Sequence, residues 1–122
     1  MKATILVVED DAFIREMAES MILGWGHDIL SACDVPQALM HLRSAEHIDA
    51  LFTDVYLNAE IHGGSDVARE ALLLRPGLPV LYTTGNRATD KLHGLFAAGA
   101  QFLPKPYTED QLALSVSKLL AA

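Results

Sequence analysis

The sequence of 122 residues contains a single cysteine, Cys33, and little positive charge. One cysteine excludes an internal disulfide and any cluster of thiolate metal ligands. Nine lysines and arginines stand against sixteen acids, the formal net charge at pH 7 is −7, and the basic residues form no run. Direct binding to nucleic acid or to an anionic membrane is therefore not expected.

Long apolar segments are absent as well. The apolar stretch that begins at Thr4 is interrupted at Glu9, which is too early for a signal peptide or a transmembrane helix, so we expect a cytoplasmic protein. There is no linker, repeat or low-complexity segment, and the composition of 51% hydrophobic and 20% charged residues is typical of a globular protein. We expect one domain over residues 1–122 with no output domain.

What the sequence does contain is an alternation of short apolar runs with longer segments of helical periodicity. The runs predict five strands: Thr4–Val8, Ile29–Ala32, Ala50–Thr53, Pro79–Thr83 and Ala100–Leu103. Helices are predicted from Phe13 to about Gly24, from Pro36 through Leu42, from a cap at Ser65 to Leu74, over Thr89–Ala98, and from a Thr108–Gln111 capping box onward. Five βα units predict an α/β fold, a flavodoxin-like doubly wound parallel sheet with strand order 2-1-3-4-5.

Polar side chains stand where four of these runs end. Glu9 and Asp10 follow the first run, Asp54 the third, Thr84 the fourth and Lys105 the fifth. The carboxyl ends of parallel strands meet at one edge of the sheet, which is where such folds bind ligands. Each residue taken singly is typical of a solvated turn or a helix cap. Their joint occurrence at four strand ends favours a functional site, whereas Asp11 is predicted only to cap the first helix.

The three acids predict a metal site. Glu9, Asp10 and Asp54 offer carboxylate oxygens, and oxygen ligands suit Mg²⁺. The backbone carbonyl of Tyr56 could add a further ligand. The five histidines of the chain show no metal-ligand spacing and are predicted to lie on the surface.

The same set predicts chemistry on a phosphoryl group. A carboxylate can accept a phosphoryl group as an aspartyl-phosphate, and Asp54 is the best candidate because it stands alone at a strand end. The metal would offset charge on the transferring group and Lys105 would pair with its oxygens. Thr84 would donate a hydrogen bond to the phosphoryl group.

Four motifs resemble those of response-regulator receiver domains of two-component signalling. They are Leu6–Asp11, Phe52–Asp54, Pro79–Gly85 and Lys105–Tyr107, and they span essentially the whole chain in the order and spacing of that family. The resemblance implies that Asp54 takes a phosphoryl group from a histidine of a sensor kinase or a phosphotransfer protein. It also implies that Glu9, Asp10 and Asp54 hold Mg²⁺, and that Thr84 and Lys105 contact the phosphoryl oxygens.

Two further features follow from the resemblance. The Lys105–Pro106 peptide bond is expected to be cis, and Phe102 falls at the aromatic switch position of the family. Phosphorylation would draw Thr84 inward and let Phe102 rotate, which would change a protein-binding surface. Output would then pass to a downstream protein or along a phosphorelay, from a monomer or a weak homodimer.

The sequence departs from the commonest receiver pattern after the phosphoacceptor. Asn58 replaces a proline, and the segment Asn58–Gly64 is longer than usual, which bears on the choice of partner more than on phosphorylation. We hypothesise that the bulk of Tyr56 slows hydrolysis of the aspartyl-phosphate. Slow self-dephosphorylation and self-phosphorylation from a phosphodonor are the only catalysis expected.

Two alternatives belong to other classes. The chain could be a non-phosphorylated receiver-like adaptor, although a degenerate receiver usually loses one of the residues Asp10, Asp54, Thr84 and Lys105. It could be a phosphatase with Asp54 as nucleophile, but that class needs a second acid two residues later, where this chain has Tyr56.

Overall fold

The computed structural model describes residues 2–55, 57, 63–84 and 101–121. The strands in these ranges are β1 (Thr4–Val8), β2 (Asp28–Ala32), β3 (Ala50–Asp54), β4 (Val80–Thr84) and β5 (Gln101–Pro104). The helices in them are α1 (Ala12–Gly24), α2 (Val35–Arg43), α3 (Gly63–Leu74) and α5 (Glu109–Ala121). The helix predicted over Thr89–Ala98 lies outside the described residues.

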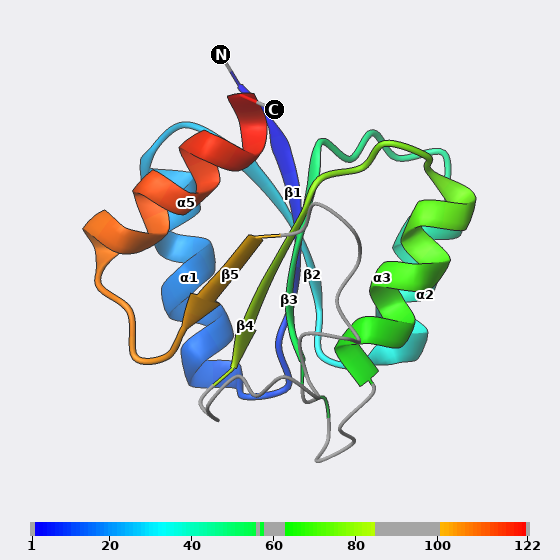
Figure 1. Cartoon of the computed structure of the whole chain (residues 1–122), viewed down its shortest axis with the longest axis horizontal. Helices are drawn as coiled ribbons and strands as arrows, with labels where there is room; N and C mark the ends of the chain where they lie inside the picture. Colours follow the sequence, from blue (N-terminus) through cyan, green and yellow to red (C-terminus); the bar gives the residue numbers. More distant parts are fainter. Residues whose placement is uncertain (1, 56, 58–62, 85–100, 122) are drawn as a thin grey trace.

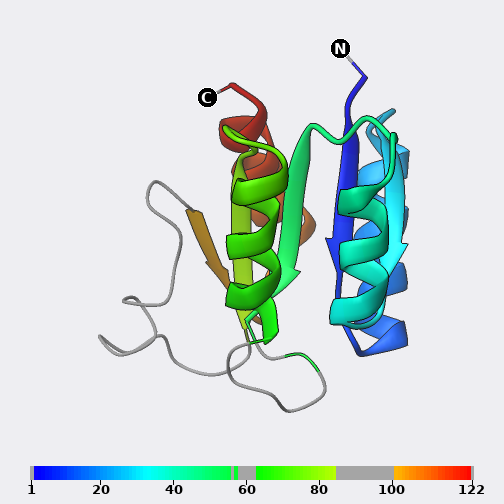
Figure 2. The same cartoon turned by 90° about the vertical axis from the view of Figure 1, so that its right-hand side faces the viewer.

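The strands form one parallel sheet in the order β2-β1-β3-β4-β5, as predicted. Figure 2 shows the strands side by side in this order. Helices α1 and α5 cover one face of the sheet, while α2 and α3 cover the other. The carboxyl ends of all five strands lie at one end of the molecule, and both chain termini lie at the opposite end (Figure 1). The polar residues that follow the strands are therefore brought to one edge.

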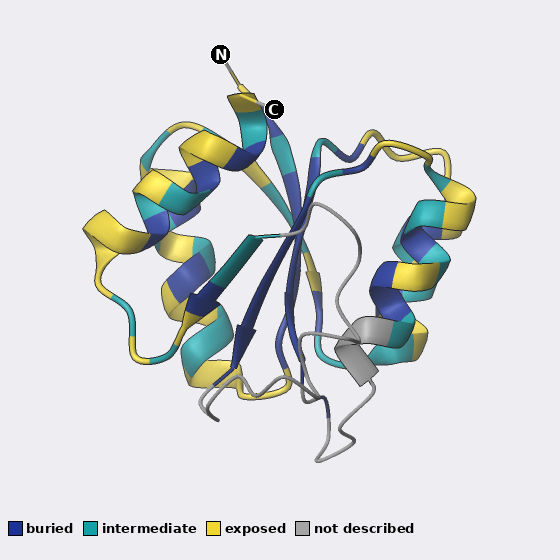
Figure 3. Cartoon of the chain, in the orientation of Figure 1, coloured by how far each residue is buried: buried dark blue, intermediate teal, exposed yellow. Residues whose placement is uncertain are grey.

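Burial on both faces explains why the strands read as continuous apolar runs. Along β1, Ile5 and Val7 point into the core under α1 and α5, while Leu6 and Val8 point into the core under α2 and α3. Figure 3 shows the central strands as the most buried part of the chain.

Local signals fix the starts of three helices. The side chain of Asp11 accepts a hydrogen bond from the Ile14 amide at the start of α1, at 3.1 Å. At the start of α5, the Gln111 amide donates to Thr108 Oγ1 at 3.1 Å, and the Thr108 amide donates to Gln111 Oε1 at 2.9 Å. This reciprocal pair confirms the predicted capping box. At the start of α2 the Asp34 side chain accepts from the Gln37 amide at 2.9 Å, and the proline lies in the first turn.

The prediction for the third helix was wrong at its start. Helix α3 begins at Gly63, so Ser65 is its third residue and not its cap, and the preceding loop is shorter than predicted. Glycine has poor helix propensity, which placed the start too late on sequence alone. Packing of Val67, Ala68 and Ala71 into the sheet supplies the stability of this helix, since tertiary contacts outweigh propensity.

Two smaller differences concern strand ends and helix faces. Asp54 and Thr84 are the last residues of β3 and β4, where the prediction had them just beyond the strands. In α1 the apolar spacing predicted the helix, but its two buried residues are Ala18 and Ile22, whereas Phe13 is 71% exposed. Among the described residues no helix is both long and apolar enough to span a bilayer.

Candidate functional site

Three acids meet at the carboxyl edge of the sheet. Glu9 follows β1 and Asp54 ends β3, and these strands are neighbours with Val8 beside Thr53. Carboxylate oxygens of Glu9, Asp10 and Asp54 all lie within 4.8 Å of one another. Glu9 and Asp54 are buried, and Asp10 is exposed. The strand order therefore gathers the three predicted acids.

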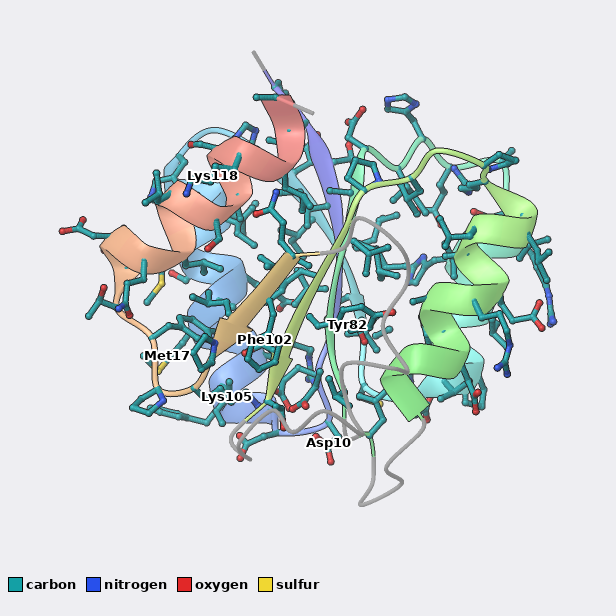
Figure 4. All side chains as sticks on the ribbon, viewed as in Figure 1. Asp10, Met17, Tyr82, Phe102, Lys105 and Lys118 are labelled. Atoms are coloured by element: carbon teal, nitrogen blue, oxygen red, sulfur yellow. The ribbon has the colours of Figure 1, made fainter. Side chains whose placement is uncertain are left out.

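Lys105 reaches this group from the end of β5. Its Nζ donates to Glu9 Oε1 at 2.5 Å and to Asp54 Oδ2 at 2.6 Å. Figure 4 shows Lys105 and Asp10 at the same end of the sheet. The sequence predicted Lys105 as a partner of phosphoryl oxygens, and the structure places it on the carboxylates themselves. The lysine thus neutralises part of the acidic charge.

Burial and pairing act against each other on these groups. Burial raises the pKa of Glu9 to about 7, although the hydrogen bond from Lys105 opposes the rise. Burial alone would lower the pKa of Lys105, but its hydrogen bonds to Asp54 and Glu9 outweigh that effect and raise the pKa above its ordinary value. The ammonium is therefore held in its charged form.

Backbone and side-chain contacts hold Glu9 in place. Its Oε2 accepts from the Asp11 amide at 3.1 Å, and its carbonyl accepts from Arg15 Nη1 at 2.9 Å. Asp11 caps α1, as predicted, and is not one of the three acids that come together. Arg15 was not singled out from the sequence, because its position one helical turn beyond Asp11 carries no signal by itself.

The other predicted residues lie around this core. Thr84 is buried at the end of β4, and Phe102 is the second residue of β5, half-buried against the core under α2 and α3. Their predicted roles in contact and switching stay predictions. The Lys105–Pro106 bond is cis, as the resemblance implied. Tyr56 and the segment 58–62 lie outside the described residues, so the proposed carbonyl ligand and the altered loop stay predictions too.

Two residues beside the acids were missed. Thr83 is only 3% exposed and stands beside Asp54 in the register of β3 and β4. Tyr107 packs edge-on against Phe52, with ring centroids 6.1 Å apart, and burial raises the pKa of its hydroxyl. Thr83 precedes Thr84 directly, so the strand alternation could have placed it on the face of Asp54.

The donor chemistry fits a hard divalent cation. Three carboxylates and one ammonium leave a net charge of −2 when all are ionised. Like charges so close together are unfavourable unless a cation offsets them, and carboxylate oxygens suit Mg²⁺. Glu9, Asp10 and Asp54 are the residues that could hold it.

An apolar cleft adjoins the acids. It has a volume of about 320 Å³ and lies between α1 and the segment after β5. Its lining consists of Ile14, Met17, Met21, Lys105, Pro106 and Tyr107. Lys105 belongs both to the cleft and to the acidic group, so the two features are neighbours.

Comparison with known proteins gives consistent matches. Residues 5–117 match the family profile described as "Response regulator receiver domain". The probable transcriptional regulatory protein TcrX of Mycobacterium tuberculosis is 32% identical over 96% of this chain and 49% of its own length. The transcriptional regulatory protein ZraR of Escherichia coli is 31% identical over 96% of this chain and 26% of its own length. The chain thus spans half or less of these relatives.

Solved structures agree with the sequence matches. The crystal structure of a response regulator receiver protein from Sinorhizobium medicae superposes with a TM-score of 0.90 at 30% identity, covering 99% of this chain and 96% of that one. The structure of NtrX from Brucella abortus superposes with a TM-score of 0.88 at 28% identity, over 99% of this chain and 27% of its own.

Proposed function

Because the chain belongs to the response regulator receiver family, we propose that Asp54 accepts a phosphoryl group from a phosphohistidine partner and that the phosphorylated chain signals to another protein. The supporting observation is the group formed by Glu9, Asp10, Asp54 and Lys105 at the carboxyl edge of the sheet. It combines a nucleophile, a hard-metal site and a cation for anionic oxygens.

The chemistry assigns each residue a task. A carboxylate oxygen of Asp54 attacks phosphorus, the P–N bond to the donor imidazole breaks, and its electron pair returns to the imidazole. Glu9, Asp10 and Asp54 would hold Mg²⁺, which would supply positive charge to offset the phosphoryl oxygens. Lys105, already on Asp54, can exchange a carboxylate oxygen for a phosphoryl oxygen with little movement.

Thr84 and Phe102 would transmit the conformational change that phosphorylation causes. Thr84 lies at the end of β4, beside Asp54's strand, and donates its hydroxyl to the phosphoryl group in this proposal. Phe102 lies one strand further along on the face of α2 and α3. A rotation of Phe102 would change the surface at the β5 edge, where a downstream protein or a further relay component would bind.

The donor would approach along the apolar cleft. Transfer requires its histidine to reach Asp54, and the cleft shares Lys105 with the site. Met17 is 45% exposed in its wall and the neighbouring Phe13 is 71% exposed. We assign this surface to an apolar helix face of the phosphohistidine protein.

Phosphorylation by a small donor tests the proposal. We expect the chain, incubated with Mg²⁺ and acetyl phosphate, to gain one phosphoryl group in intact-mass measurements, and to gain none without Mg²⁺. Asp54→Ala should abolish the adduct, while the matched Asp28→Ala, at an exposed position far from the site, should keep it. Absence of any adduct on the parent would favour the non-phosphorylated adaptor instead.

A further inference from the structure

A small cavity lies beside Glu9, between the sheet and α1. Its volume is about 10 Å³, and its polar lining comes from Glu9, Thr83 and Tyr107. The rest of its wall is apolar and includes Ala18 and Phe52. The space is of the size that one water molecule needs, roughly 10–15 Å³.

Thr83, which lines this space, carries an unsatisfied hydroxyl. The residue is 97% buried, and its Oγ1 has no hydrogen-bond partner among the residues that the structure describes. Thr83 stands beside Asp54 in the parallel register and on the face of Leu81, which packs under α1 and α5. A buried hydroxyl without a partner is unfavourable, and native proteins usually satisfy such groups with protein or ordered water.

Glu9, which carries a carboxylate, lines the same cavity. Glu9 is 5% exposed and already accepts from Lys105 through Oε1 and from the Asp11 amide through Oε2. Each carboxylate oxygen has two acceptor sites, so Glu9 retains acceptor capacity. Dry cavities are lined by apolar groups alone, whereas a space of this size lined by Glu9 and Thr83 can offer hydrogen-bond partners to a single water.

We propose that one ordered water molecule occupies this cavity and bridges Thr83 Oγ1 to a carboxylate oxygen of Glu9. The water satisfies the threonine hydroxyl and adds a hydrogen bond to the glutamate. Thr83 is then a positioning residue that fixes the Glu9 carboxylate for the metal. The positioning role of Thr83 rests on the proposed function, whereas the presence of the water does not.

A crystal structure of the full parent chain tests the water directly. We expect one ordered water within hydrogen-bond distance of both Thr83 Oγ1 and a Glu9 oxygen. Thr83→Ser should keep it, and Thr83→Val, which has the same shape without the hydroxyl, should lose it. A dry cavity in the parent, or a Thr83 hydroxyl bonded to a protein group, would overturn the proposal even if the valine variant failed to fold.

Mg²⁺ titration by calorimetry tests the positioning role. Thr83→Val should lower the Mg²⁺ affinity about tenfold, the lower end of what loss of a group supporting a metal ligand costs. Thr83→Ser should bind like the parent. Equal affinity in all three proteins would refute the positioning role, whereas a parent that binds no Mg²⁺ would count against the proposed function and leave the crystallographic result to decide the water.

Discussion

At the scale of single residues, the site consists of buried charged side chains whose opposite charges partly compensate one another. The side chains of Lys105, Glu9 and Asp54 are 15%, 6% and 7% exposed. Transfer of such groups from water is costly, and the ion pairs compensate only while both partners are present. Lys105 therefore stabilises the fold before any phosphoryl group arrives, in addition to its proposed contact with the product.

Removal of this lysine should expose the repulsion between the acids. We expect Lys105→Met to lower the free energy of unfolding at pH 7 by on the order of 3 kcal/mol, because it removes the positive charge that contacts two buried carboxylates. Added Mg²⁺ should restore more stability to this variant than to the parent, since the cation takes over the compensation. Urea denaturation with and without Mg²⁺ measures both effects.

Lys118→Met is the matched control for that variant. Lys118 is an exposed residue of α5 and lies far from Lys105 in Figure 4. Its replacement should change the free energy of unfolding by less than about 0.5 kcal/mol, with or without Mg²⁺. A Lys105→Met protein as stable as the control would mean that the acids need no compensating charge.

At the scale of elements, side chains attach the ends of helices to the rest of the fold. His41 near the end of α2 lies 3.1 Å from the Ser31 carbonyl through Nε2 and 2.8 Å from Glu46 Oε1 through Nδ1. Arg75, just after α3, donates to the carbonyls of Leu42 and Ser44. The side chain of His41 is 18% exposed, and its ring lies between a strand and a loop at the surface.

The pair of His41 and Glu46 should make stability depend on pH. The hydrogen bond from His41 lowers the pKa of Glu46 below its ordinary value of 4.5. The carboxylate thus contributes stability that is present above the unfolded pKa and is lost as the pH falls through the folded one. We expect the urea midpoint of Glu46→Gln to lie below that of the parent at about pH 6, and the difference to shrink as the pH falls below 4.5 and through the folded pKa.

Glu16→Gln, at an exposed position of α1, controls for the loss of a negative charge. Its midpoint should follow that of the parent throughout this range. A Glu46→Gln difference that persisted unchanged at low pH would assign the effect to packing and not to the carboxylate.

The capping box of α5 should have a measurable share in stability. Thr108→Ala removes the acceptor for the Gln111 amide and should lower the free energy of unfolding by about 1 kcal/mol. Ser117→Ala, at an exposed interior position of the same helix, should be neutral or slightly stabilising, because alanine has the higher helix propensity. Urea denaturation followed by circular dichroism compares the two, and equal stability of both variants would show that the cap is dispensable.

At the scale of the whole molecule, the sheet separates two cores. Ile22 belongs to the core under α1 and α5, and Ile48 to the core under α2 and α3. Every strand of the sheet lies between them, as Figure 1 shows. A substitution in one core should therefore not directly change the packing of the other.

This separation predicts additivity. Ile22→Val and Ile48→Val should each lower the free energy of unfolding by about 0.5–1.5 kcal/mol. The double variant should lose the sum of the two within about 0.5 kcal/mol, since the sites share no partners. Denaturant titration of the parent, the two single variants and the double variant completes this double-mutant cycle. A coupling free energy well above that margin would mean that the sheet transmits strain between its faces.

The sequence by itself determined the elements, the strand order and the membership of the acidic group. Apolar runs reveal strands buried on both faces, and caps such as Asp11 and Thr108 are local contacts between residues a few positions apart. Once the strands were ordered, parallel topology alone brought Glu9, Asp10 and Asp54 to one edge.

Only the tertiary structure decided how the side chains at that edge satisfy one another. Lys105 bonds to Glu9 across 96 positions of sequence, and the buried Thr83 hydroxyl has no hydrogen-bond partner in the part of the chain that the structure describes. The start of α3 at Gly63 was also set by packing against local propensity. Such features depend on distances of a few ångströms between segments far apart in the chain, and those distances come from how whole elements pack, which no local pattern records.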